Sequence, residues 1–356
     1  MRIFICLVVW MLVLEVSISQ APKFSNDFLN IGIGGRGMAM AGAVSANTSS
    51  IQAAYWNPAG LPYNPSKFQV SAQHAEWFSG IGNYDYVAFG KSFSDDFSNY
   101  GSLTLIRMAI DKIPNTLRLR GPDGSIDYSK IEEFSVADYA MLLSFGKKIG
   151  DGKWAFGVNG KVIHRNFGAF ANSWGFGFDA GIRYHSKNFA FAIMGRDITT
   201  TFNAYKFNFS TEEKAILQQT NNSIPISSVE YNLPKVIIAL SYKVTVTSKF
   251  SLLSALDLEC SSNGTESAIL ATNKFAVDPK VGVELDYANR VFVRFGFGNF
   301  QNVVKDITTD QRELSFNPSA GLGIQFGKIT IDYAMTNIAN SGVGLYSHFL
   351  SLNLDF

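Results

Sequence analysis

Apolar and polar residues alternate at a spacing of two along most of the chain from residue 66 onward. Trp174 and Phe176, for example, flank Gly175. Successive side chains of a β-strand point to opposite faces, so this period indicates strands with one apolar face and one polar or small-residue face. The segments with this pattern are 67–78, 83–92, 100–111, 134–147, 153–165, 173–186, 189–197, 233–246, 249–259, 280–287, 291–297, 319–326, 329–335 and 348–356.

The last of these segments, 348–356, narrows the fold class. Its apolar residues alternate with polar ones and it ends in the carboxy-terminal Phe356, as the closing strand of a bacterial outer-membrane barrel does. A soluble β-sandwich would show the same alternation. The even number of strands, the terminal Phe and the amino-terminal leader favour the barrel. We therefore predict an all-β, transmembrane antiparallel β-barrel of about 14 strands over residues 66–356.

The lengths of the connections give a direction to this barrel. Every second connection is short: 93–99, 148–152, 187–188, 247–248, 288–290 and 327–328. Most of the others are long and polar: 112–133, 198–232, 260–279, 298–318 and 336–347, with shorter ones near 79–82 and 166–172. Outer-membrane barrels have short periplasmic turns and longer extracellular loops, so the pattern predicts a multi-pass protein of the bacterial outer membrane with its C-terminus in the periplasm.

Two local features stand out in this pattern. The alternation slips at Ile106-Arg107, which predicts either a bulge or a different register there. In the longest loop, Ser210 or Thr211 precedes acidic residues, and a short helix is expected to follow over residues up to 219. A loop that holds a helix can cap the barrel or present a docking surface for a partner.

The amino-terminal residues read as a secretory signal peptide over 1–19. Arg2 precedes an apolar run over 3–14 and a small-residue segment over 17–19. The run is shorter than the ~20 residues that a membrane-spanning helix needs. Cys6 lies inside this removable segment, so Cys260 is expected to be the only cysteine of the mature chain. A single thiol can form neither an internal disulfide nor a cysteine-based metal site.

The composition agrees with a barrel. Hydrophobic residues make up 47% and charged residues 17% of the chain, yet the apolar residues after position 19 are dispersed in alternation. The 30 Phe and 14 Tyr suit lipid-facing positions and the aromatic girdles at the two membrane interfaces. The formal net charge of +1 gives no indication of nucleic-acid binding.

Residues 20–65 differ from the strands and are predicted to form an N-terminal hatch inside the lumen. They are dense in Gly and Ala, which allow backbone to pack against backbone. Asn57-Pro58 is a turn signal that holds Asn57 out of the α region.

Three stretches of this region resemble the PorV/PorQ family of Bacteroidota outer-membrane proteins, which is itself similar to FadL-type fatty-acid transporters. They are residues 28–32 (Phe-Leu-Asn-Ile-Gly), the stretch 36–43 that begins with Arg36, and residues 56–61. The hatch motif residues are Arg36, Trp56, Asn57, Pro58, Ala59 and Gly60. In architecture the resemblance extends over the whole mature chain.

The resemblance implies a barrel whose lumen holds the N-terminal segment. From it we predict a non-enzymatic component of type IX protein secretion or cargo attachment. FadL-like transport of hydrophobic small molecules is the alternative, and a structural or adhesive barrel is a third possibility. Members of the PorV/PorQ group serve type IX secretion, beside the translocation pore or in handing secreted cargo to the attachment machinery. FadL-type relatives bind and pass hydrophobic compounds. An apolar cavity beside the hatch would favour transport, whereas a filled, ion-paired lumen with apolar extracellular loops would favour partner docking.

Several charged residues are predicted to point into the lumen. The principal candidates are Asp179, Arg183, Asp257, Glu284, Arg294 and Asp332. Arg36, within the hatch, would need a carboxylate partner to avoid a buried unpaired charge. A structural ion pair between hatch and wall is the main interpretation, and a functional latch is the alternative.

Other chemistry has little support. Gly32, Gly34, Gly35 and Gly37 are not followed by the Lys-Ser/Thr of a phosphate loop. The four histidines, His74, His164, His185 and His348, lack the spacing of a metal site. We therefore predict no enzymatic activity, no cofactor and no metal. The expected partners are outer-membrane lipid, a hydrophobic ligand, and type IX translocon or attachment proteins with their cargo.

Overall fold

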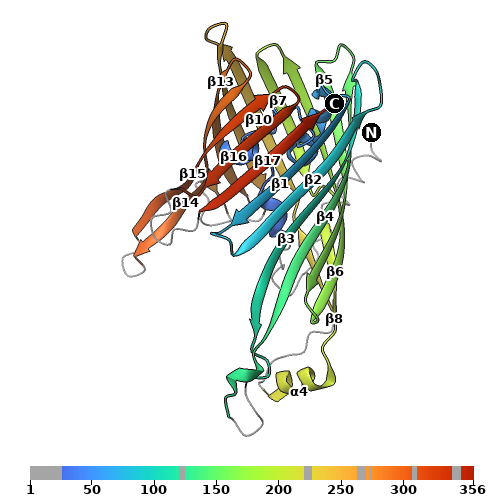
Figure 1. Cartoon of the computed structure of the whole chain (residues 1–356), viewed down its shortest axis with the longest axis vertical. Helices are drawn as coiled ribbons and strands as arrows, with labels where there is room; N and C mark the ends of the chain where they lie inside the picture. The colour runs from blue at the N-terminus through green and yellow to red at the C-terminus, as the bar shows by residue number, and fades with distance from the viewer. Residues whose placement is uncertain are drawn as a thin grey trace, which may run out of the picture.

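Antiparallel pairing of β1 with both β2 and β17 closes the strands into a ring. The structure is a computed structural model that describes residues 26–119, 125–219, 227–262, 270–272, 275–306, 311–338 and 346–356. Of its 17 strands, β8 continues β7, β9 leads into β10, and β12 pairs with the start of β13. The result is a closed antiparallel barrel of 14 strands, which confirms the predicted fold class (Figure 1). The predicted signal peptide lies outside the described residues.

The strands have the following bounds: β1 Phe68–Trp77, β2 Gly82–Ser92, β3 Asn99–Asn115, β4 Glu132–Ile149, β5 Trp154–Phe167, β6 Ala171–Ser186, β7 Phe189–Arg196, β8 Thr201–Phe207, β9 Ser227–Asn232, β10 Lys235–Thr245, β11 Phe250–Ser261, β12 Leu270–Ala271, β13 Ala276–Tyr287, β14 Val291–Asp306, β15 Gln311–Phe326, β16 Ile329–Thr336 and β17 Ser347–Asp355. No helix of the described residues is long and apolar enough to cross a membrane.

The strands extend further at one end than the sequence predicts. The expected loop 298–318 is largely strand, because β14 continues to Asp306 and β15 begins at Gln311. The expected loop 198–232 contains β8 and β9, which pair with each other. Backbone pairing does not need an apolar face, so it continues where the lipid-directed alternation has ended. The C-terminus lies at the other end of the barrel (Figure 1).

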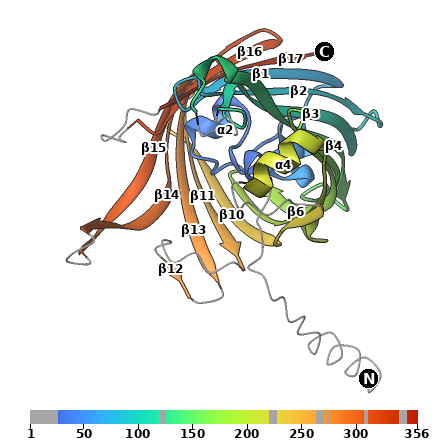
Figure 2. The same ribbon diagram turned by 90° about the horizontal axis from the view of Figure 1, so that it is seen from below.

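The helix predicted in the longest loop is present as α4, Thr211–Gln219. The Ser210 hydroxyl accepts a hydrogen bond from the Glu213 amide at 3.2 Å, and the Glu213 carboxylate accepts one from the Ser210 amide at 2.7 Å. This reciprocal pair is a capping box, which satisfies two amides at the start of the helix. Figure 2 shows α4 across the end of the barrel where the long connections lie.

The structure has no bulge at Ile106-Arg107, where the slip in the alternation predicted one. The pairing of β3 with β2 and with β4 runs without a register shift through Ile106-Arg107, and the irregularity falls between Ile110 and Ile113. Arg107 interrupts the apolar pattern because it faces outward and donates to Asp85 at 3.1 Å. His74 contacts the other Asp85 oxygen at 2.8 Å. The break in the apolar alternation is thus caused by a polar side chain on the outer wall.

The outer wall carries an apolar band between two aromatic borders. On β6, Phe176 and Phe178 face outward and are about half exposed, whereas the next residue, Asp179, faces inward and is buried. Trp174 packs on His164 at 4.4 Å at one border, and Tyr184 packs on Trp154 at 5.0 Å at the other. Ten residues of tilted strand separate the two borders, which corresponds to roughly 25 Å along the membrane normal, the height expected for an outer-membrane barrel.

Residues 26–65, called here the N-terminal segment, lie inside the ring. They contain η1 Asp27–Asn30, α2 Gly35–Ala39, α3 Ala53–Trp56 and η2 Pro58–Tyr63. Figure 2, a view along the barrel, shows α2 enclosed by the strands. Most of this segment is buried, including the whole stretch 51–62. The core of the molecule is therefore the contact between this segment and the inner wall.

Candidate functional site

The motif residues 56–60 form a turn that packs against the wall. Asn57 is extended, with φ of −164°, and its side-chain oxygen accepts a hydrogen bond from the Ala59 amide at 3.0 Å. Pro58 occupies the first position of η2, where its missing N–H costs nothing. The structure thus has the predicted turn, with Asn57 as its cap.

The wall opposite this turn is made of glycines. Gly146, Gly157 and Gly181 are direct neighbours on β4, β5 and β6. A Cβ on Gly157 would lie 2.5 Å from the Pro58 carbonyl oxygen and closer still to the Pro58 carbonyl carbon and the Ala59 nitrogen. Only glycine allows this approach of backbone to backbone.

A second glycine contact holds the other side of the N-terminal segment. Gly296 on β14 faces the backbone of Met40, which leaves no space for a Cβ. Beside it, the Ser319 hydroxyl donates to the Ala39 carbonyl at 3.0 Å. The segment is therefore fixed at two places on opposite sides of the ring.

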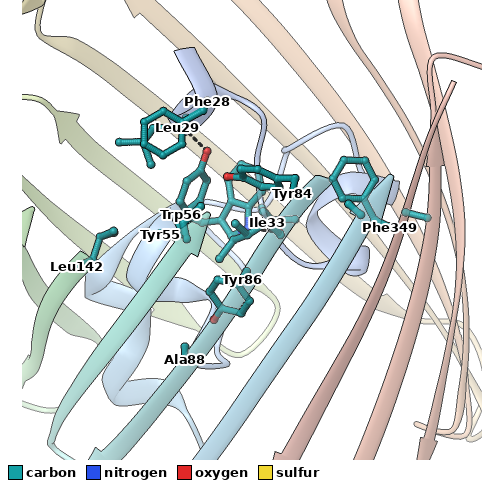
Figure 3. Packing of buried hydrophobic residues seen from close by; sticks show 14 of the residues in the cluster. Phe28, Leu29, Ile33, Tyr55, Trp56, Tyr84, Tyr86, Ala88, Leu142 and Phe349 are labelled. Atoms are coloured by element: carbon teal, nitrogen blue, oxygen red, sulfur yellow. Dashed lines mark hydrogen bonds between the residues drawn. The ribbon is translucent and has the colours of Figure 1, made fainter. Parts of the chain in front are cut away.

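Aromatic residues form the centre of the segment (Figure 3). Trp56 is 6% exposed, and its indole N–H donates to the Ile33 carbonyl at 3.1 Å. Tyr55 packs edge-on against Trp56 and donates its hydroxyl to the Leu29 carbonyl. Burial raises the pKa of the Tyr55 phenol, so this side chain is a neutral donor at physiological pH.

Arg36 belongs to a buried chain of four charges. Its guanidinium donates to Glu284 at 2.8 Å and to Asn47 at 2.8 Å. Glu284 also accepts from Arg294 at 2.6 Å, and Arg294 donates to Asp332 at 2.7 Å. Four of the residues singled out in the sequence thus meet, and they join the segment to β13, β14 and β16.

Asp179, one of the predicted lumen residues, belongs to a second buried cluster. Lys161 donates to Asp179 at 2.7 Å and also contacts Asp197. Asp197 lies in the interruption between β7 and β8, with a positive φ of 56°, and its amide donates to Asp179 at 2.8 Å. This cluster of Lys161, Asp179 and Asp197 therefore connects the break between β7 and β8 to the neighbouring strands β5 and β6.

Arg183 and Asp257 are inward and buried, and each forms a hydrogen bond with the backbone of the N-terminal segment. Arg183 donates to the Thr48 carbonyl at 2.6 Å and lies over the Tyr63 ring. Asp257 accepts from the Ser45 amide at 3.0 Å. Both side chains thus bind the backbone of the N-terminal segment directly.

A polar cavity of about 460 Å³ lies between the N-terminal segment and β10, β11 and β13 to β16. Its charged lining residues are Arg196, Lys235, Asp257, Glu259, Asp278 and Lys280. Glu259 accepts from Lys235 at 2.8 Å and from Lys280 at 2.7 Å. Acidic and basic groups balance in this cavity, which suits water and polar solutes.

A larger cavity of about 680 Å³ lies on the other side of the segment, and eight of its 18 lining residues are aromatic. Phe28 from η1 and Trp77 from β1 form its inner side. The remaining aromatic lining residues are Phe134, Phe167, Phe170, Tyr205, Phe207 and Phe209. This is the size and character of a site for a small apolar molecule.

Ile31 and Trp77 line both cavities and so separate them. The aromatic cavity was not predicted from the sequence. The available signal was a reversal of pattern: inward positions of β6 carry Gly, Ser and Asp, whereas the inward positions Phe134, Phe167 and Phe207 are aromatic.

Among the described residues no group of three or more His, Cys, Asp or Glu side chains is placed to hold a metal ion. His74, His164 and His348 lie on strands at outward-facing positions, while His185 packs near Tyr63. Cys260 is a free thiol.

Comparison with solved structures places the fold. The Pseudomonas putida toluene transporter TodX matches with a TM-score of 0.57 at 11% identity, over 91% of this chain and 99% of that one. The CymD monoaromatic hydrocarbon channel matches with 0.57 at 12% identity, over 92% and 98%. A Pseudomonas aeruginosa FadL homologue matches with 0.52 at 11% identity, over 94% and 100%.

The chain therefore has the FadL-like outer-membrane β-barrel fold. At such low identity the likeness concerns the fold alone. Neither the protein-family models nor the curated proteins gave a match.

Proposed function

We propose that this protein is a bacterial outer-membrane barrel that binds small hydrophobic molecules in its aromatic cavity and passes them inward. The observation that carries the proposal is the cavity of about 680 Å³ with eight aromatic lining residues, enclosed in a FadL-like barrel. The similar structures include a toluene transporter and a monoaromatic hydrocarbon channel, which supports the same substrate class.

In this proposal the N-terminal segment acts as a hatch. It separates the aromatic cavity from the polar one, with Ile31 and Trp77 between them. The charge chain from Arg36 to Asp332 and the glycine contacts hold it in place. A molecule would pass beside the hatch rather than displace it, because both sides of the segment are fixed to the wall.

The orientation follows the connections. We place the long connections and the aromatic cavity at the extracellular end of the barrel. The short turns and Phe356 then lie at the periplasmic end. The similar structures support transport of hydrophobic molecules better than the type IX secretion role implied by the PorV/PorQ resemblance. No catalytic step is part of the proposal.

Filling the cavity tests the site. Ala171 lies on its wall and is 5% exposed. In the Ala171→Phe variant the added ring occupies ligand space, and we expect binding of benzyl alcohol to weaken by about tenfold, or ~1.4 kcal/mol. Equilibrium dialysis of the purified full chain against empty detergent micelles measures this.

The matched control is Ala204→Phe, an outward-facing position on β8 that pairs with Trp174. It adds the same ring to the outer wall and should leave binding unchanged. Equal loss in both variants, or none in Ala171→Phe, would contradict the proposed site.

Gentle extraction from outer membranes followed by mass spectrometry separates the two readings of the family resemblance. A bound apolar compound would support the proposal. Type IX translocon or attachment subunits on a barrel without such a compound would favour the secretion role instead.

A further inference from the structure

The aromatic residues that line the cavity are in contact with one another. Phe134 and Phe170 meet edge to face with centroids 5.2 Å apart, and Phe170 lies 6.0 Å from Phe209. Phe207 is stacked on Phe209 at 6.2 Å. The face of an aromatic ring carries partial negative charge and attracts cations, and several rings around one cavity form the environment that binds organic ammonium groups.

The charged residues of the same cavity add to this preference. Among the described lining residues they are Asp27, Asp138, Arg165 and Glu230. Arg165 donates to both oxygens of Asp138, at 2.7 Å and 3.0 Å. The described lining therefore carries three carboxylates and one guanidinium, which leaves an excess of negative charge.

Glu230 is a carboxylate that a ligand in this cavity can reach. Its nearest oxygen is 3.7 Å from Arg165, beyond hydrogen-bond distance, and its side chain keeps 21% exposure. Arg165 is already held by Asp138 and by the Tyr205 hydroxyl at 2.7 Å. A ligand carboxylate would therefore meet Glu230 without gaining a ready cation, whereas a ligand cation would meet both Glu230 and the rings.

We propose that the aromatic cavity selects for positive charge and takes an organic cation, a protonated or quaternary amine on an apolar or aromatic body. This inference rests on the proposed function and sharpens it. Binding of a neutral ring compound, without preference for a cation, would support the proposed function but not this inference. A carboxylate such as a fatty acid is disfavoured at this cavity.

Three probes that share a phenyl ring and differ in charge test the preference: benzyltrimethylammonium, benzyl alcohol and benzoate. The quaternary cation keeps its charge at every pH. Equilibrium dialysis of the full chain in non-ionic detergent at low salt is expected to give the tightest binding for the cation and the weakest for benzoate, with about fivefold between the cation and the alcohol. Benzoate binding as tightly as the cation would overturn the inference.

Variants locate the effect. Glu230→Gln should weaken binding of the cation by about fivefold and leave benzyl alcohol unchanged. The control Glu76→Gln makes the same chemical change at the neighbour of the cavity residue Trp77, on the opposite, outward face of β1. An unchanged cation affinity in a folded Glu230→Gln variant would overturn the role of Glu230.

The outcomes separate the two proposals. Binding of benzyl alcohol that is lost in Ala171→Phe, without preference for the cation, keeps the proposed function and overturns this inference. Binding of none of the three probes overturns both. Should Glu230→Gln fail to fold, the three probes on the unchanged chain still decide the charge preference.

Discussion

Replacing Glu284 with glutamine is expected to lower the free energy of unfolding by about 3–5 kcal/mol, because the change leaves buried positive charge without its partner. Among the described residues, Glu284 is the one carboxylate paired with Arg36, and it also binds Arg294 at 2.6 Å. Arg294 is 2% exposed and would keep Asp332 as its carboxylate partner. A glutamine amide keeps the shape of the side chain but cannot neutralise two guanidinium groups.

Denaturant unfolding of the refolded barrel measures this change, and protease sensitivity of residues 26–65 reports whether the segment detaches first. The control is Glu212→Gln on α4, which removes an exposed ion pair with Arg118 and should cost no more than ~1 kcal/mol. If Glu284→Gln costs no more than the control, the charge chain does not hold the segment.

Replacing Gly157 with alanine is expected to cost about 1–3 kcal/mol, because the new methyl group has no space. It would overlap the backbone of Pro58 and Ala59, which cannot rotate away as a flexible side chain would. The turn must then move off β5, and with it the neighbouring contacts of Asn57 and Pro62 with the wall.

The matched control for this change is Gly160→Ala on the same strand. Gly160 points to the outer wall, and its Cβ would meet only Phe178 at an ordinary 3.6 Å. Both variants lose the same glycine entropy in the unfolded chain, so their difference isolates the contact with the turn. Equal stability of the two variants, measured in the same denaturant series, would show that the turn adapts at no cost.

The transmembrane part of the fold was predictable because lipid imposes a strict period. On β6 and β17 the outward residues within the membrane band, such as Phe176, Phe178 and Leu350, are apolar, so the alternation gives both strand and face. Beyond the membrane band this constraint ends. β8 and β9 therefore escaped notice within the long polar connection, and β14 and β15 were predicted too short.

The candidate site was only partly predictable for a related reason. That Arg36 needs a carboxylate follows from burial, but the choice of Glu284 among several inward acids depends on where the segment docks. The aromatic cavity is assembled from η1, seven strands and their turns, with no local motif. Its clearest local trace is the aromatic residues at inward positions such as Phe134 and Phe167.

The most direct test of transport is the initial rate at which N-phenyl-1-naphthylamine, an apolar dye that fluoresces once inside a membrane, enters intact cells that carry the barrel in their outer membrane. We predict entry several times faster than in cells without the protein, with the gain lost in Ala171→Phe and kept in Ala204→Phe at equal amounts of folded barrel. Entry no faster than in cells without the protein, or a gain that Ala171→Phe leaves intact, would contradict passage through the aromatic cavity.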